Sequence, residues 1–172
     1  MVRAFIGVGS NIRPEENVRK ALQLLASKVS ILEISTVYST EAEGQPELPR
    51  YYNCVVEIET EASPTQLKHE ILRQIEKELG RERTEDKFAP RTIDLDLILY
   101  DELVLTSDDL VLPDPQIPNR PYLAIPLYEL DSELILPGTG LRIEEVAGQL
   151  EHSSMIPLRF YTAFLKKEIF HG

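Results

Sequence analysis

The sequence predicts an α+β fold, a ferredoxin-like sandwich of β-α-β-β-α-β order with an added hairpin and C-terminal helices. Three observations predict it: apolar residues alternate along four segments of the first hundred residues, they recur every three to four positions in two others, and glycine, proline and capping residues separate these segments. Elements in this order are typical of one sheet with helices on one face. The other face is then available for a ligand.

The first strand and helix open the chain. Residues 3–9 alternate as a strand does, and a glycine-bearing turn is expected at residues 9–11. Pro14 then suits the first turn of a helix, where its missing N–H costs nothing. The apolar face of the strand consists of Ala4, Ile6 and Val8. The apolar stripe of the helix consists of Val18, Ala21, Leu22 and Leu25.

Two further strands and a second helix follow. Residues 30–38 and 51–59 are rich in β-branched and aromatic types and are expected to be strands. Ser63 and Gln66 form a capping box, and Gly80 is a suitable end for the helix that begins there. Its apolar stripe has a spacing of four and consists of Leu67, Ile71, Ile75 and Leu79.

The fourth strand of the predicted sheet is TIDLDLILY, residues 92–100. Beyond it we expect a hairpin over residues 101–112 and helices within 119–130 and 143–150. The chain is expected to form a single domain, residues 1–172, with its core at 3–150. The sequence leaves open how the tail, residues 152–172, packs.

Composition limits the class of protein. With 172 residues, 42% of them hydrophobic, the chain can bury a core of ordinary size, and its single cysteine, Cys54, excludes an intramolecular disulfide framework. The net charge of -11 disfavours nucleic acid as a partner. The sequence contains no apolar run of membrane-spanning length and no signal peptide, so a cytoplasmic protein without a membrane partner is expected. Monomer and homodimer both remain open.

Two aspartates stand out in the fourth predicted strand. Asp94 and Asp96 alternate with Ile93, Leu95 and Leu97, so both carboxylates project from one face, with Cα atoms about 7 Å apart. Carboxylates so placed are suited to divalent cations, and paired Mg2+ ions are common in phosphoryl transfer. The alternative is a solvated outer face, which any amphipathic strand needs. Like charges on one face repel, however, so the pair calls for a counterion.

Arginines cluster near these aspartates in the sequence. Arg81, Arg83 and Arg91 lie within eleven residues of an otherwise acidic chain. Their guanidinium groups match the geometry of phosphate oxygens, although surface arginines are often simply solvated. The standard nucleotide motifs are missing, because G-x-G at Gly7 continues with Ile12 and no G-x-x-x-x-G-K-[ST] occurs. Together, the carboxylates and arginines favour phosphoryl transfer at a site of another kind.

The segment FAPRTIDLDLILY, residues 88–100, closely resembles the signature of the 6-hydroxymethyl-7,8-dihydropterin pyrophosphokinase family. The resemblance covers residues 3 to about 150 in the family's order. It extends to GVGSN at 7–11, VYST at 37–40, YYN at 51–53, GRER at 80–83 and NRPYLAIPL at 119–127.

The resemblance implies an activity: transfer of pyrophosphate from ATP to the hydroxyl of a reduced hydroxymethylpterin, releasing AMP, in folate biosynthesis. It also implies roles for particular residues. Asp94 and Asp96 would bind two Mg2+ ions, and with Arg81 and Arg91 they would be the catalytic residues. The implied ATP-binding residues are Glu76, Arg81, Arg83, Arg91 and Arg120, and the implied pterin-binding residues are Thr40, Tyr51, Asn53 and Tyr122.

Two departures from the family pattern concern charge. The family usually has Pro, His, Pro where this chain has Pro113, Asp114 and Pro115, and Asp109 stands where a basic residue is common. Asp114 is expected to weaken ATP binding.

Two other functions remain alternatives: a noncatalytic protein that binds a small ligand or a partner on the same fold, and an RNA-binding sheet, which the acidic balance disfavours.

Overall fold

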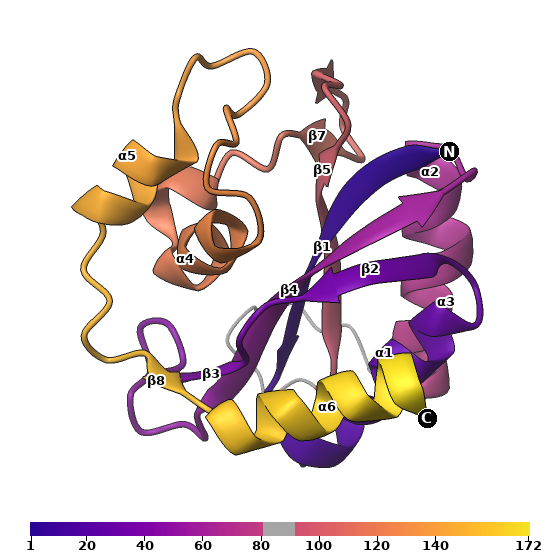
Figure 1. The fold of residues 1–172 in the computed structure, drawn as a ribbon, viewed down its shortest axis with the longest axis vertical. Helices are drawn as coiled ribbons and strands as arrows, with labels where there is room; N and C mark the ends of the chain where they lie inside the picture. Colours follow the sequence, from indigo (N-terminus) through magenta and orange to yellow (C-terminus); the bar gives the residue numbers. More distant parts are fainter. Residues whose placement is uncertain (81–91) are drawn as a thin grey trace.

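The computed structural model describes residues 1–80 and 92–172, in which one six-stranded sheet forms the centre of the fold (Figure 1). Its strands are antiparallel in the order β5-β1-β4-β3-β8, and β2 also pairs with β4. A separate two-stranded hairpin, β6 with β7, follows β5. The bounds are β1 Val2–Ser10, β2 Ser30–Ile34, β3 Tyr38–Thr40, β4 Tyr51–Thr60, β5 Asp94–Tyr100, β6 Leu105–Thr106, β7 Val111–Leu112 and β8 Ile156–Pro157.

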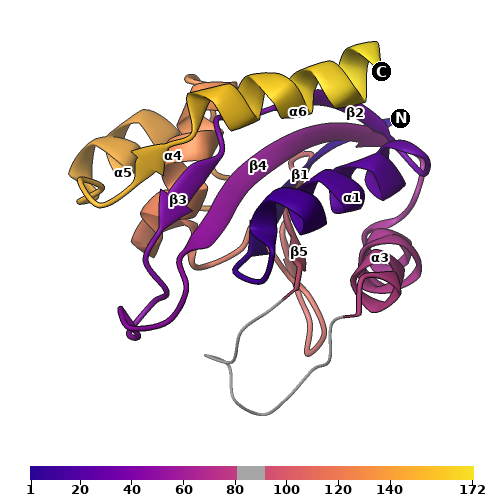
Figure 2. The same ribbon diagram turned by 90° about the horizontal axis from the view of Figure 1, so that it is seen from below.

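Helices cover both faces of the sheet, as the two views of the ribbon show (Figures 1 and 2). One face carries α1, α3 and α6, and the other is partly covered by α4 and α5. The bounds are α1 Pro14–Ala26, α2 Pro64–Gln66, η1 Leu67–Leu72, α3 Arg73–Glu78, η2 Ile117–Asn119, α4 Pro121–Leu130, α5 Ile143–Gln149 and α6 Arg159–His171. In the ranges that the structure describes, every helix is too short or too polar to cross a membrane.

The predicted apolar faces form the cores. Ala4, Ile6 and Val8 of β1 are buried against the α1 stripe, while Phe5 belongs to a second core beneath α4 and α5. The sheet order places β5 beside β1 and β4 on the other side of β1, as a ferredoxin-like sandwich requires. The predicted fold class is therefore confirmed, and part of the second sheet face stays uncovered beside α4.

Several predicted boundaries were wrong for identifiable reasons. The single strand expected at 30–38 is two strands, β2 and β3, both paired with β4. The turn expected at 9–11 begins later, because β1 runs through Ser10. In β5 the register shifts opposite Phe5 and Ile6, so Ile98 and Leu99 both belong to the second core, and Leu99 does not share the face of Leu97.

The second long helix begins at its predicted capping box: the Ser63 hydroxyl accepts from the Gln66 N–H and the Gln66 side chain accepts from the Ser63 N–H. Its middle, η1, is a π-helix, which inserts one residue into the helical register. Leu72 therefore takes the fully buried place expected for Ile71. Leu67 and Ile75 are buried as predicted.

The C-terminal tail packs against the body of the protein. β8 pairs with β3, and α6 lies across the α1 side of the sheet (Figure 2). The hydroxyl of Thr162 accepts a hydrogen bond from the Val37 N–H at 2.9 Å, and Leu165 is fully buried in the first core. This answers the question of packing that the sequence left open.

Candidate active site

A cavity of about 590 Å³ opens on the partly uncovered sheet face. Its size suits a small-molecule ligand. Strands β1, β3, β4 and β5 form its floor, and the start of α4 and the loop after β3 form its walls. The predicted site residues that line it are Thr40, Tyr51, Asn53, Asp94, Asp96, Arg120 and Tyr122.

Two glycines of β1 make room on the cavity floor. In the sheet register Gly9 lies between Asn53 of β4 and Asp94 of β5, and Gly7 lies opposite Asp96. A Cβ atom at Gly9 would be 2.7 Å from Asn53 Oδ1, too close for any side chain. The missing side chain leaves a space between the Asn53 and Asp94 strands, which stand about 10 Å apart, two strand spacings. The turn role expected for Gly9 was wrong, because Gly9 lies within β1.

Asp94 and Asp96 line this cavity from the same face of β5, as their spacing predicts. Enclosure in the cavity, followed by the nearby charge of Asp94, raises the pKa of Asp96 to about 7. Asp114 also lines the cavity and adds to this shift. The region therefore carries an excess of negative charge that a bound cation would relieve.

The donor set fits Mg2+. Two carboxylates on one strand are a usual protein contribution to a magnesium site that takes its other ligands from water and substrate phosphates. Within residues 1–80 and 92–172, no group of three or more His, Cys, Asp or Glu side chains is arranged to hold an ion by itself. Among the described residues, a cation at Asp94 and Asp96 would take its other ligands from water and substrate phosphates.

The other end of the cavity has aromatic and neutral polar side chains. Tyr51 and Tyr122 both line it, and burial raises the pKa of the Tyr122 hydroxyl, which donates a 3.4 Å hydrogen bond to Glu43. The Asn53 amide donates to the Thr40 hydroxyl at 2.7 Å. Flat apolar rings combined with a fixed amide suit a planar heterocycle that has polar edges.

Arg120 is the residue at the N-terminus of α4. In the part of the chain that the structure describes, its Nε atom is buried without a hydrogen-bond partner. Glu43 is 3.8 Å from this atom, and the guanidinium carbon lies 5.9 Å from the centre of the Tyr122 ring. A buried donor without an acceptor is costly, so Arg120 is suited to receive an anionic ligand.

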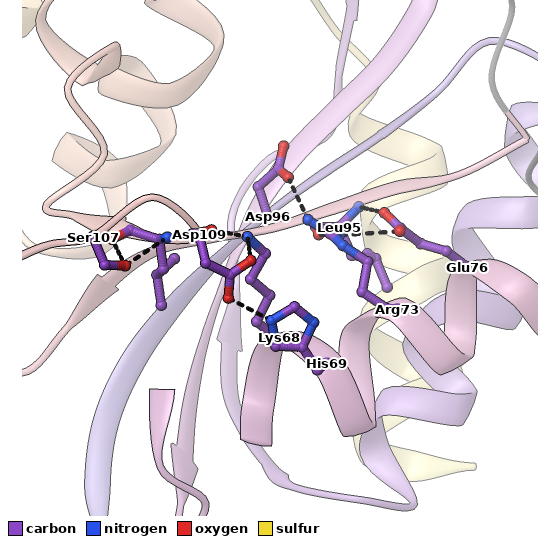
Figure 3. A network of polar contacts seen from close by, with 9 residues as sticks. Lys68, His69, Arg73, Glu76, Leu95, Asp96, Ser107 and Asp109 are labelled. Atoms are coloured by element: carbon purple, nitrogen blue, oxygen red, sulfur yellow. Dashed lines mark hydrogen bonds and ion pairs between the residues drawn. The ribbon is translucent and has the colours of Figure 1, made fainter. Parts of the chain in front are cut away.

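Four of the predicted site residues are not among those that line the described cavity, three of them because the structure does not describe them. Arg81, Arg83 and Arg91 lie outside the described residues. Glu76 is 2% exposed and is absent from the cavity lining; its Oε2 atom accepts from the Leu95 N–H at 2.8 Å (Figure 3). Sequence reasoning missed Arg73, which reaches the same strand, although its place three residues before Glu76 on a helix is typical of an ion pair.

The second charge departure, Asp109, is satisfied by basic neighbours. Its carboxylate is 2.5 Å from His69 Nε2 and 3.4 Å from Lys68 Nζ, both on the π-helix (Figure 3). These contacts tie the loop of the β6–β7 hairpin to η1 and not to the cavity, which Asp109 does not line.

The fold and the cavity together define a class: a ferredoxin-like protein with a ligand-sized cavity that a carboxylate pair, an arginine and two tyrosine rings line. Residues 5–132 match the family described as 7,8-dihydro-6-hydroxymethylpterin-pyrophosphokinase (HPPK). The chain belongs to this family.

Relatives with the family activity in their names cover most of the chain. It is 35% identical over 161 residues to the 2-amino-4-hydroxy-6-hydroxymethyldihydropteridine pyrophosphokinase of Haemophilus influenzae, covering 92% of this chain and 99% of the relative. The enzyme of that name from Bacillus subtilis is 33% identical over 83% of this chain and 86% of its own length. The folic acid synthesis protein fol1 of Pneumocystis carinii is 34% identical over 81% of this chain but only 19% of its own length.

Solved structures agree on the fold. A crystal structure of Plasmodium falciparum HPPK-DHPS superposes with a TM-score of 0.68 at 12% identity. It covers 86% of this chain, and the chain spans less than half, 45%, of that longer protein. At this identity the likeness concerns the fold alone.

Proposed function

We propose that this protein transfers pyrophosphate from ATP to the hydroxymethyl group of 6-hydroxymethyl-7,8-dihydropterin, giving AMP and the pterin diphosphate. The observation that carries the proposal is one cavity that unites Asp94 and Asp96 with Tyr51, Asn53 and Tyr122 in a member of the HPPK family. The step belongs to folate biosynthesis. The noncatalytic alternative is not favoured, because the chain belongs to the HPPK family and its relatives are named as pyrophosphokinases.

The pterin would occupy the aromatic end. Its ring would lie between Tyr51 and Tyr122, with Asn53 bonding its polar edge and Thr40 holding the Asn53 amide in place. The space above Gly9 would let the hydroxymethyl group extend from Asn53 toward Asp94. The sheet register itself would thus set the direction of attack.

The nucleotide would bind across β5. Arg120 would contact the phosphates, together with the predicted ATP residues Arg81, Arg83 and Arg91 and with Glu76 nearby. Asp94 and Asp96 would hold two Mg2+ ions, which when bound supply charge neutralisation to the phosphate oxygens. The pterin hydroxyl oxygen forms a bond to the β-phosphorus, the bond from that phosphorus to the α,β-bridging oxygen breaks, and AMP leaves with that oxygen. The hydroxyl proton passes to solvent.

Catalysis would come from alignment and charge. The cavity carboxylates are assigned to the metal ions and no side chain is assigned as a general base, because in phosphoryl transfer positioning and electrostatic stabilisation account for most of the rate. Asp114 adds a negative charge beside the phosphates, which is expected to weaken ATP binding without removing the carboxylate pair.

Product analysis tests the proposal. The purified chain, incubated with ATP, Mg2+ and the reduced hydroxymethylpterin, should form AMP and pterin diphosphate in equal amounts. Omission of either the pterin or Mg2+ should abolish AMP formation. Release of ADP, or AMP formation without the pterin, would reject the proposed reaction.

A further inference from the structure

β5 carries the carboxylate pair and is an edge strand. In the described sheet it pairs with β1 along one side, and its other side faces η1 and α3. An edge strand presents N–H and C=O groups that no neighbouring strand can satisfy. The partners that these groups find therefore decide how firmly the strand, and the aspartates on it, are held.

Leu95 lies between the two aspartates, and its main-chain N–H and carbonyl both bond to the side chains of one ion pair. Its N–H donates to Glu76 Oε2 at 2.8 Å, and its carbonyl accepts from Arg73 Nη1 at 2.9 Å. The same Arg73 nitrogen donates to Glu76 Oε1 at 3.0 Å (Figure 3). We call Arg73, Glu76 and the main chain of Leu95 the edge clamp. In it, two side chains take the place of a neighbouring strand.

The edge clamp fixes the two peptide groups on which the aspartates depend. The Leu95 N–H belongs to the peptide that follows Asp94, and the Leu95 carbonyl belongs to the peptide that precedes Asp96. Holding both peptides sets the backbone dihedrals that aim the two Cα–Cβ bonds. Small changes in those dihedrals would move the carboxylates apart or turn them from the cavity.

Arg73 also extends past the clamp toward the carboxylates. Its Nη2 atom lies 3.9 Å from Asp96 Oδ1, while its side chain is largely enclosed. The planar fork of arginine suits this double task, because one nitrogen bonds the clamp while the other is directed at Asp96 (Figure 3). A lysine would offer one nitrogen for both places.

We infer that Arg73 is a positioning residue for phosphate transfer: through the edge clamp it holds Asp94 and Asp96 in the arrangement that binds metal and nucleotide. The inference rests on the proposed function, and it goes beyond it in assigning a role to a side chain that does not line the cavity. Groups that orient metal ligands from behind commonly change metal affinity or activity by about 10- to 100-fold when altered.

The test compares Arg73→Lys with Arg142→Lys. Arg142 is a matched control, because it also pairs with a glutamate three residues later, Glu145 at 3.6 Å, but on the exposed surface. Melting temperatures first establish that each variant is folded. Three properties are then measured: hydrogen exchange of the Leu95 amide in the metal-free protein, the Mg2+ concentration that half-saturates the ATP reaction, and kcat with KM for the pterin.

Arg73→Lys should speed Leu95 amide exchange and raise the half-saturating Mg2+ concentration, each by about tenfold. We expect kcat to fall by about tenfold and KM for the pterin to change by less than about twofold, since the pterin end of the cavity is untouched. Arg142→Lys should change none of these values. If Arg73→Lys does not fold, Arg73→Gln, a shorter and neutral donor, replaces it with the same expectations.

Folded Arg73 variants with wild-type Leu95 exchange and wild-type Mg2+ dependence would overturn the positioning role. A loss of melting temperature with those two values unchanged would show that the clamp only stabilises the fold, which also rejects the inference. Failure of the proposed function has a separate sign, because the unaltered protein would then form no AMP. The Leu95 exchange measurement tests the clamp even in that case.

Discussion

Among single residues, Asp96 connects folding to metal binding through its ionisation. Its pKa of about 7 in the folded protein lies above the ordinary value of 3.8, because the cavity and Asp94 disfavour its charge. The unfolded chain thus ionises first as pH rises. Metal-free protein should lose stability between about pH 4 and pH 7 on account of this group, and the loss should be complete above pH 7.

Asp96→Asn should therefore stabilise the metal-free protein. Its free energy of unfolding at pH 8 should exceed that of the wild type by roughly 1–2 kcal/mol. This value is reduced from the full shift because the Asp96 side chain, although surrounded by the cavity, leaves about half its surface open to water that screens its charge. Urea unfolding at pH 4 and pH 8 checks this, since the difference should nearly vanish at pH 4. A destabilised variant at pH 8 would show that Asp96 is satisfied without a cation.

Substitution of Asp114 tests whether its negative charge opposes ATP binding. Both Asp114→His and Asp114→Asn remove a negative charge beside the proposed phosphate site, and Asn can still accept from the Gln116 N–H as Asp114 does at 2.8 Å. KM for ATP should fall in both variants by about fivefold, or about 1 kcal/mol for a carboxylate in a solvated cavity. Steady-state kinetics with varied ATP measure it. An unchanged or higher KM in both would mean that Asp114 does not oppose the nucleotide.

The site residues that the sequence revealed are those whose chemistry is unusual for their element. Two aspartates on an apolar strand conflict with strand preference, so the residues themselves made the pair a candidate site, with a solvated outer face as the alternative. Tyr51, Asn53 and Tyr122 are ordinary in their local patterns, and only the family resemblance indicated them. Arg73 was missed because its partner, the main chain of Leu95, becomes a neighbour only when the sheet places β5 beside the helix.

At the scale of elements, α6 contributes to the core through one side chain while leaving another in solvent. Leu165 is fully buried, and Phe160 is 93% exposed. Leu165→Ala should lower the free energy of unfolding by about 2–4 kcal/mol through the cavity that it leaves. Phe160→Ala, the matched control, should change it by less than about 0.5 kcal/mol.

Urea unfolding of the two variants makes this comparison. A cost for Leu165→Ala no larger than that for Phe160→Ala would show that α6 is not docked on the sheet in solution. The packing of α6 could not be predicted from the sequence, because aromatic and aliphatic residues of the tail fall on several sides of the helix and only tertiary packing decides which are covered.

The errors in element prediction have a common physical origin. Period and capping residues located most helices and strands up to residue 150, although they merged β2 and β3, but the register within the elements depends on neighbours. The π-turn at η1 lets Leu72 replace Ile71 in the core, and the bulge in β5 moves Leu99 to the other face. The π-helix η1 runs directly into α3, and the bulge lies in β5, so each irregularity is next to or within an element that forms the edge clamp. Neither has a signature in apolar spacing.

For the whole molecule, topology explains why a site exists at this place. The two central strands, β1 and β4, bring Gly9 and Asn53 side by side, and β5 adds Asp94 in the same row. The order of elements predicted this sheet, and the chain's membership in the HPPK family agrees with it. The order of elements could not predict that α4 partly covers the second sheet face, which turns an open face into a cavity.

Crystals grown with Mn2+, a nonhydrolysable ATP analogue and the reduced pterin test whether Asp94 and Asp96 hold the metal ions that bind the nucleotide. Anomalous scattering locates the metal directly in such crystals. We expect metal peaks at the carboxylates of Asp94 and Asp96, beside the phosphates, with the pterin ring between Tyr51 and Tyr122. Peaks away from both aspartates, with the phosphates bound elsewhere on the surface, would contradict it.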